Sequence, residues 1–159
     1  MEFYYPNFQN DMWRIFGGVF FGDKDYFLTD DKRSFDRLRV ENFLIKNGIA
    51  LGDTAQVVIR HKDNASDKFL EIVKPASPAF FLQQLPQLKA FVTTGQKATD
   101  TFVALTGAPQ PLVGGFSKFV FAGRPLRLYR MPSSSRAYPM SLAEKTKIYG
   151  AMFKEIGIL

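Results

Sequence analysis

The sequence lacks cysteine and contains a single histidine among its 159 residues. Without cysteine the chain can form no disulfide, no thiolate nucleophile and no cysteine-ligated metal site. One histidine, His61, cannot build a multi-histidine metal centre, and a histidine-based triad would rest on it alone. His61 also lies between Arg60 and Lys62, which is typical of a solvated basic loop. We therefore expect no metal site and no thiol chemistry.

Long apolar stretches are absent too. No apolar run approaches the roughly 20 residues that cross a bilayer, and residues 1–6 lack the basic start and apolar middle of a signal peptide. We expect a cytoplasmic protein with no membrane partner. The chain shows no repeat, low-complexity tract or linker. We therefore expect one domain, residues 1–159, which is long enough to bury a core.

Positive charge and phenylalanine are what the chain has in excess. Its net charge is +6, and it contains 17 phenylalanines. The basic balance favours an anionic partner, of which nucleic acid is the commonest, although modest basicity also occurs in proteins that bind none. The phenylalanines favour aromatic packing or aromatic pocket walls.

The spacing of apolar residues predicts helices that alternate with short strands. Helices are expected over residues 8–20, 35–46 and 78–85, and from residues 95 and 141 onward; strands are expected over residues 49–51, 90–93, 116–121 and 126–131. The last two strands could pair or follow one another, and residues 57–74 are ambiguous. Such alternation predicts an α/β fold with a mostly parallel sheet that is covered on both faces.

Three strand ends meet at one edge of this predicted sheet. They are Asp53–Thr54, Thr94–Gly95 and residues 132–136. Ligands of open α/β sheets bind where parallel strands end in loops. Asp53 there can cap a turn, accept hydrogen bonds from a ligand or act as a base. We expect the functional site at this edge.

Two of these strand ends favour an anion. Ser133, Ser134 and Ser135 precede Arg136, and hydroxyls beside a guanidinium suit phosphate or sugar oxygens. The alternative is a solvated surface loop. After Thr94–Gly95, the start of a helix and the charge of Lys97 also favour an anion, although such junctions are generic in α/β folds and this one lacks the spacing of a P-loop.

The beginning of the sequence is aromatic, with amides interleaved: Tyr4-Tyr5-Pro6-Asn7-Phe8-Gln9-Asn10-Asp11-Met12-Trp13. Aromatic rings can stack on a nucleobase, and amides can recognise base edges. The alternative is a terminal segment that packs its aromatic rings on the core.

Taken together, these segments resemble motifs of the uracil-DNA glycosylase superfamily. Residues 4–14 are similar to the segment after the first catalytic motif, in which a tryptophan opens a helix. Residues 131–136 (MPSSSR) resemble the second motif in the mismatch-specific thymine/uracil branch. Residues 48–54 fall where these enzymes place a base-recognition strand, and residues 63–67 (DNASD) are similar to a polar loop of the hypoxanthine-DNA glycosylase branch. The segments occur in family order along nearly the whole chain.

The resemblance implies a three-layer α/β/α sandwich with a short, mostly parallel central sheet. It implies a monomeric base-excision repair enzyme that flips uracil, hypoxanthine or a mismatched base out of DNA, because the reacting bond is inaccessible within the stack. The enzyme would hydrolyse the N-glycosidic bond without metal or cofactor. By motif, Tyr5 would stack on the flipped base, Asp53 would contact its edge and Asn10 would line the pocket. Pro132, Ser133, Ser134, Ser135 and Arg136 would bind the backbone of the target strand and press into the minor groove. Apart from the resemblance, the charge of Lys97 at the start of its helix makes it a further candidate DNA-binding residue.

One feature of the family has no counterpart in the sequence. The family places a strand and a loop with glycine and proline before the aromatic segment, and this loop positions the attacking water. Here the sequence begins on the aromatic segment, so motif matching assigns no catalytic residue. We favour a fragment that lacks an N-terminal strand over a degenerate homologue that binds nucleic acid without cleaving it. A small-molecule domain with an anion site at Thr94–Gly95 is the third hypothesis.

Overall fold

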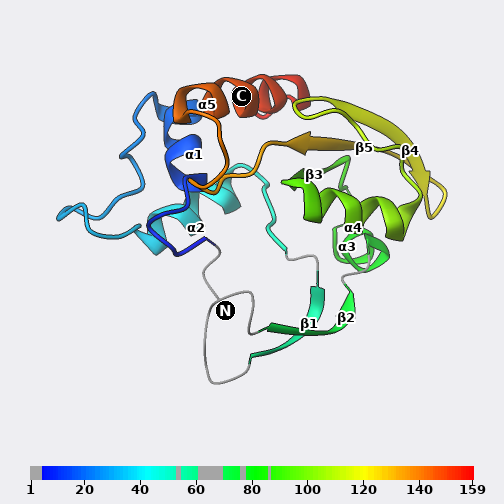
Figure 1. Ribbon diagram of the computed structural model, residues 1–159. Coiled ribbons are helices and arrows are strands. Elements are labelled where there is room, and N and C mark those ends of the chain that lie inside the picture. Colours follow the sequence, from blue (N-terminus) through cyan, green and yellow to red (C-terminus); the bar gives the residue numbers. More distant parts are fainter. Residues whose placement is uncertain (1–4, 53–54, 61–69, 76–77, 86) are drawn as a thin grey trace.

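The computed structural model describes residues 5–52, 55–60, 70–75, 78–85 and 87–159 (Figure 1). The helices are α1 (Met12–Phe21), α2 (Arg37–Lys46), α3 (Pro78–Gln84), α4 (Gln96–Thr106) and α5 (Leu142–Ile156). The strands are β1 (Ala55–Arg60), β2 (Leu70–Pro75), β3 (Ala90–Thr94), β4 (Phe116–Phe121) and β5 (Arg124–Met131). The predicted α/β class is confirmed. Over these residues, no helix combines the length and apolarity needed to span a membrane.

Three strands form a sheet in the order β3-β5-β4. β3 and β5 run parallel, so Thr94 and Met131 lie side by side where the two strands end. β4 pairs with β5 antiparallel, with Phe116 opposite Tyr129. This sheet is therefore mixed, and the expectation of a mostly parallel sheet is not confirmed. β1 and β2 form a separate antiparallel pair.

A two-residue turn makes one edge of the sheet antiparallel. Ala122 and Gly123, between β4 and β5, have φ angles of 51° and 75°. Two consecutive positive φ angles are typical of a type I′ turn, whose twist matches that of paired strands. The sequence left open whether these two segments pair, and this turn makes them neighbours. Alanine is unfavourable in left-handed backbone, whereas asparagine adopts it more readily.

Replacing Ala122 with asparagine should therefore stabilise the protein. We expect Ala122→Asn to raise the free energy of unfolding by about 0.5–1 kcal/mol, as measured by chemical denaturation. Ala104→Asn, on the exposed side of α4, is the matched control. It should destabilise, because asparagine is a poorer helix former than alanine. A loss of stability in both variants would contradict this role of the turn.

β5 is buried on both faces, because its side chains alternate between two hydrophobic clusters. Tyr129 and Met131 belong to a cluster with residues of α1, α2 and α5. Leu126 and Leu128 belong to a second cluster with residues of α3, α4 and β4. In Figure 1, α1 and α5 lie on one side of this strand, and α3 and α4 lie on the other. This packing fixes the end of β5, from which the serine-rich loop begins.

The prediction of a strand at residues 49–51 is wrong. The chain there is irregular and closes the end of α2. Gly48 has a φ of 67°, and the Ile49 N–H donates to the Leu44 carbonyl at 3.0 Å. This pattern is a Schellman motif, in which an apolar residue after the helix packs back on it. Ile49 indeed packs against the cluster that α1, α2 and α5 share. The apolar run therefore completes a helix and adds no strand to the sheet.

Candidate functional site

Three segments that are distant in sequence meet where β3 and β5 end. The segment before α1 pairs with the serine-rich loop through a β-bridge between Asn10 and Ser135. Beside this bridge, the Asp11 N–H donates to the Ser134 carbonyl at 2.8 Å. The β3–α4 junction joins the same loop, because the Gly95 N–H donates to the Met131 carbonyl at 3.1 Å. Two of the three predicted strand ends thus lie together.

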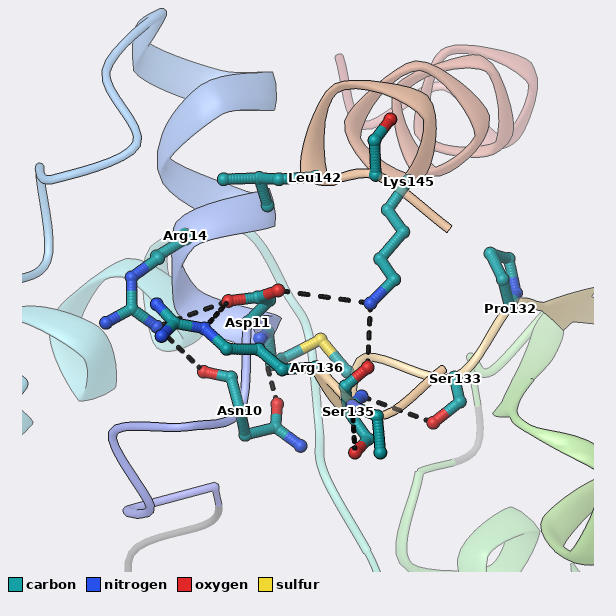
Figure 2. Close-up of polar contacts among 12 residues, drawn as sticks. Asn10, Asp11, Arg14, Pro132, Ser133, Ser135, Arg136, Leu142 and Lys145 are labelled. Atoms are coloured by element: carbon teal, nitrogen blue, oxygen red, sulfur yellow. Dashed lines mark hydrogen bonds and ion pairs between the residues drawn. The ribbon is translucent and has the colours of Figure 1, made fainter. Parts of the chain in front are cut away.

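Asp11 is surrounded by three cations at this junction (Figure 2). Its Oδ1 lies 3.3 Å from Nη1 of Arg14 and 3.1 Å from Nε of Arg136. Its Oδ2 lies 3.9 Å from Nζ of Lys145. Asp11, Arg14 and Lys145 are buried, with exposures of 6%, 5% and 1%. The carboxylate therefore joins α1, α5 and the serine-rich loop as a shared counter-ion.

The two buried cations also hold backbone carbonyls. Lys145 Nζ donates to the Ser135 carbonyl at 2.8 Å, and Arg14 Nη1 donates to the carbonyls of Phe8 and Asn10 at 2.9 and 3.2 Å. The Arg14 guanidinium also lies over the Phe8 ring. Burial lowers the pKa of Lys145, and Asp11 opposes this shift. Burial, and then the charge of Arg136, lower the pKa of Arg14.

α5 fastens the beginning of the serine-rich loop through a tyrosine. The buried Tyr149 hydroxyl donates to the Pro132 carbonyl at 2.6 Å. Burial raises the pKa of Tyr149 well above its ordinary value, so the hydroxyl stays a neutral donor. The carbonyls of Pro132, Ser134 and Ser135 thus all have donors. The loop is held by both α5 and the segment before α1.

The predicted base-pocket residues lie beside these contacts or outside the described residues. Tyr5 is half-buried; its ring meets Trp13 edge-on, and its hydroxyl lies 3.5 Å from Oγ1 of Thr94. The Asn10 side-chain oxygen accepts from the backbone N–H of Met12 at 2.9 Å, in an Asx turn that leads into α1. Asp53 lies outside the described residues, as does the polar loop over residues 63–67.

The predicted DNA-binding residues differ in exposure. Ser134 is buried, and the hydroxyls of Ser133 and Ser135 accept from backbone N–H groups within the loop. Arg136 keeps 48% of its side chain exposed while it holds Asp11. Lys97 is exposed in the first turn of α4. Among the predicted DNA-binding residues, Arg136 and Lys97 are the two cations that a phosphate could reach from solvent.

A pocket of about 80 Å³ lies between the start of α4 and the serine-rich loop. It is lined by Gly95, Gln96, Val113, Arg130, Met131, Pro132, Ser133 and Tyr138. Arg130 donates to the side-chain oxygen of Gln96 and to the Pro111 carbonyl, and its buried Nε has no hydrogen-bond partner among the described residues. Ligand pockets commonly measure about 300–1,000 Å³. This pocket therefore suits a group of phosphate size.

Sequence reasoning missed three residues of the site: Asp11, Arg14 and Lys145. Lys145 lies three residues after Leu142 and four before Tyr149, which places it on the buried stripe of α5. Arg14 lies in the otherwise apolar first turns of α1. A cation on an apolar helix face needs a buried anionic partner. That rule is the signal that could have identified both residues.

Comparison with known proteins gives no match: no family model, no curated protein and no solved structure matches this chain. Within the part of the chain that the structure describes, no three side chains of histidine, aspartate or glutamate gather as metal ligands. A function for this protein therefore has to be inferred from the geometry of the site.

Proposed function

We propose that this protein is a DNA glycosylase of base-excision repair, acting on uracil, hypoxanthine or a mismatched base. The observation that carries the proposal is the β-bridge between Asn10 and Ser135. It joins the two segments whose sequences most resemble glycosylase motifs, although 125 residues separate Asp11 from Arg136 at this contact. A shared site explains why both resemblances occur in one chain.

The chemistry of base flipping fits the groups that meet here. An extruded base needs an aromatic surface for stacking, and the strand needs contacts to its phosphates. The Tyr5 ring lies near the end of β3 and can supply the aromatic surface on which the base stacks. Arg136 and Lys97 can contact the phosphates of the strand, because both side chains are accessible to solvent. The mechanism leaves the catalytic residue unassigned.

The fold and setting belong to the same proposal. The hydrophobic clusters on opposite faces of β5 support a three-layer α/β/α sandwich. The net charge of +6 supports an anionic partner, either a damaged or mismatched duplex or a single strand. In this proposal the protein acts as a cytoplasmic monomer without metal or cofactor.

The small pocket favours a second candidate function. A phosphate-bearing small molecule could bind between the start of α4 and Ser133, since Gly95 leaves that helix without a side-chain cap. Titration with inorganic phosphate and nucleotides tests this alternative. Saturable binding of a nucleotide, together with no affinity for DNA, would favour it over the glycosylase.

Incubation with DNA tests the enzymatic proposal. The chain, and the chain extended upstream in its reading frame, would be incubated with duplexes that contain uracil, a thymine mismatch or hypoxanthine. We expect an abasic product from at least one duplex. Binding without product in all cases would favour a non-catalytic nucleic-acid-binding module. The absence of both binding and product would reject the proposal.

Replacing Arg136 tests the DNA contact itself. Arg136→Ala should weaken binding to duplex DNA and reduce the dependence of log K on log salt by about one unit, as one phosphate contact is lost. Fluorescence anisotropy across a salt series measures both effects. Lys154→Ala, in the last turn of α5, is the matched control and should leave the salt slope nearly unchanged. An identical slope for Arg136→Ala and the wild-type protein would remove Arg136 from the interface.

A further inference from the structure

β4 forms an edge of the sheet on which no other described strand lies (Figure 1). Just before β4 begins, the Arg130 N–H of β5 donates to the Gly115 carbonyl at 3.0 Å. Backbone groups of successive residues point to opposite sides of an antiparallel strand, so those of Phe116, Lys118 and Val120 point away from β5. No hydrogen bond joins them to another part of the described chain. The backbone of β4 therefore offers donors and acceptors to a further strand.

This edge has little of the protection that edge strands usually carry. Proteins prevent unwanted pairing at such edges with proline, with several charges or with very short strands. β4 (FSKFVF) spans six residues, contains no proline and has one charged residue, Lys118. On the face of Lys118, the side chains of Phe116 and Val120 are 37% and 68% exposed. The edge is therefore open and partly apolar.

Lys118 also lies beside a second cation. The register places it opposite Arg127 of β5, so the two side chains share one face of the sheet. Like charges that lie directly opposite each other destabilise a strand pair. Glu155 lies 3.9 Å from Arg127, whereas no ion pair joins Lys118 to an acidic side chain of the described residues. A carboxylate on the open side of Lys118 would therefore relieve this repulsion.

The charge of Lys118 also decides between possible occupants of the edge. Antiparallel pairing of the whole of β4 with a second copy would place Lys118 opposite the same lysine of that copy, and this arrangement is repulsive. An aspartate or glutamate opposite Lys118 is attractive instead. Phe116 and Val120, on either side of the lysine, suit β-branched apolar residues as cross-strand neighbours.

We propose that the free edge of β4 binds an extended acidic segment of another protein by β-strand addition. The segment lies antiparallel to β4, with a carboxylate opposite Lys118 and a β-branched apolar residue opposite each of Phe116 and Val120. Main-chain hydrogen bonds supply affinity, and Lys118 supplies the preference for an acidic residue. β4 contains none of the segments that carry the glycosylase resemblance, so its role does not depend on the proposed function.

Two labelled seven-residue peptides test this surface by fluorescence anisotropy. One is Thr-Val-Thr-Glu-Thr-Val-Thr, and the other has lysine in place of the glutamate. The wild-type protein should bind the glutamate peptide saturably and the lysine peptide about fivefold more weakly. Lys118→Glu should reverse this preference. Lys24→Glu, in the exposed loop after α1, changes the net charge equally and is the matched control; it should keep the wild-type preference.

Methylation of the peptide backbone tests the strand pairing itself. A methyl group on the glutamate nitrogen removes a donor that points at β4, and should weaken binding about tenfold. The nitrogen of a neighbouring threonine points away from β4, so a methyl group there should change the affinity little. This difference is expected of an added strand and not of a purely ionic contact with Lys118.

Three results would each overturn the role of the β4 edge. They are no saturable binding of the glutamate peptide up to about 1 mM, the same peptide preference in Lys118→Glu and the wild-type protein, and equal effects of the two methylations. Duplex DNA is the competing occupant of a basic surface. If the wild-type protein binds DNA and not the glutamate peptide, and Lys118→Glu weakens DNA binding, the edge belongs to DNA and the proposed strand addition is rejected. If the peptides behave as expected and DNA does not bind, strand addition stands while the proposed function fails.

Discussion

Replacing Asp11 with alanine is expected to lower the free energy of unfolding by about 3–5 kcal/mol. The carboxylate lies within ion-pair distance of Arg14, Arg136 and Lys145. Lys145 is 1% exposed and Arg14 is 5% exposed, so neither can reach water without local unfolding. Removing Asp11 leaves both buried cations without their counter-ion, while the charge of Arg136 still opposes each of them. Chemical denaturation at neutral pH measures the loss.

Two controls distinguish lost charge balance from lost contacts. Glu41→Ala removes one partner of the exposed Arg37–Glu41 pair on α2 and should cost at most about 1 kcal/mol. The double variant Asp11→Ala with Lys145→Met removes a buried cation together with its counter-ion, so it should recover part of the loss. If Asp11→Ala destabilises no more than Glu41→Ala, the buried carboxylate does not balance these cations.

The effect of Asp11→Ala should also depend on pH, with a defined sign. Burial lowers the pKa of Lys145, and Asp11 partly offsets this shift. Between the folded and unfolded pKa values of a lysine the unfolded chain binds more protons, so stability rises with pH in that window. Without Asp11 the folded pKa falls further, and the rise should begin at a lower pH. Tyr149 acts in the opposite sense at higher pH because its pKa is raised. The stabilities of the wild-type protein and of Asp11→Ala should therefore be compared between neutral pH and about pH 9.

Helices with local signals were predictable from the sequence. The helix expected from residue 141 is present as α5, and the Ser141 hydroxyl caps it by accepting from the Glu144 N–H at 3.1 Å. α3 and α4 also lie where their apolar spacing places them. The segment over residues 49–51 has the same apolar character as a short strand. Only the packing of Ile49 against the helices decides its structure, and sequence spacing does not contain that information.

The candidate site was predictable in its segments and not in its chemistry. The sequence predicted that the ends of β3 and β5 share one edge of the sheet, and the parallel pairing places Thr94 beside Met131 there. The ion cluster depends on side chains from α1, α5 and the serine-rich loop, which no local pattern connects. Arg136 was expected as a phosphate ligand, and the structure adds its role as a partner of Asp11. The exposed part of the Arg136 side chain can still bind a phosphate.

Replacing Gly95 with alanine is expected to lower the free energy of unfolding by about 2–3 kcal/mol. Gly95 begins α4 with a φ of 88° and a ψ of 167°, a region that is open almost only to glycine. A Cβ at this position would lie 3.6 Å from the Ser133 Cβ, which is an ordinary contact distance. The cost therefore comes from the backbone of the junction and not from crowding.

The strain in Gly95→Ala should reach the site as well. A junction that rotates to relieve the strain would weaken the hydrogen bond from the Gly95 N–H to the Met131 carbonyl, and would displace Ser133 at the pocket wall. DNA binding should therefore fall together with stability. Gly22→Ala is the matched control, since Gly22 ends α1 with a φ of 66° and an added Cβ would meet no atom within 4 Å. It should cost about 1 kcal/mol and leave DNA affinity unchanged. Equal losses of stability in the two variants, with affinity preserved in both, would show that the Gly95 backbone does not position the serine-rich loop.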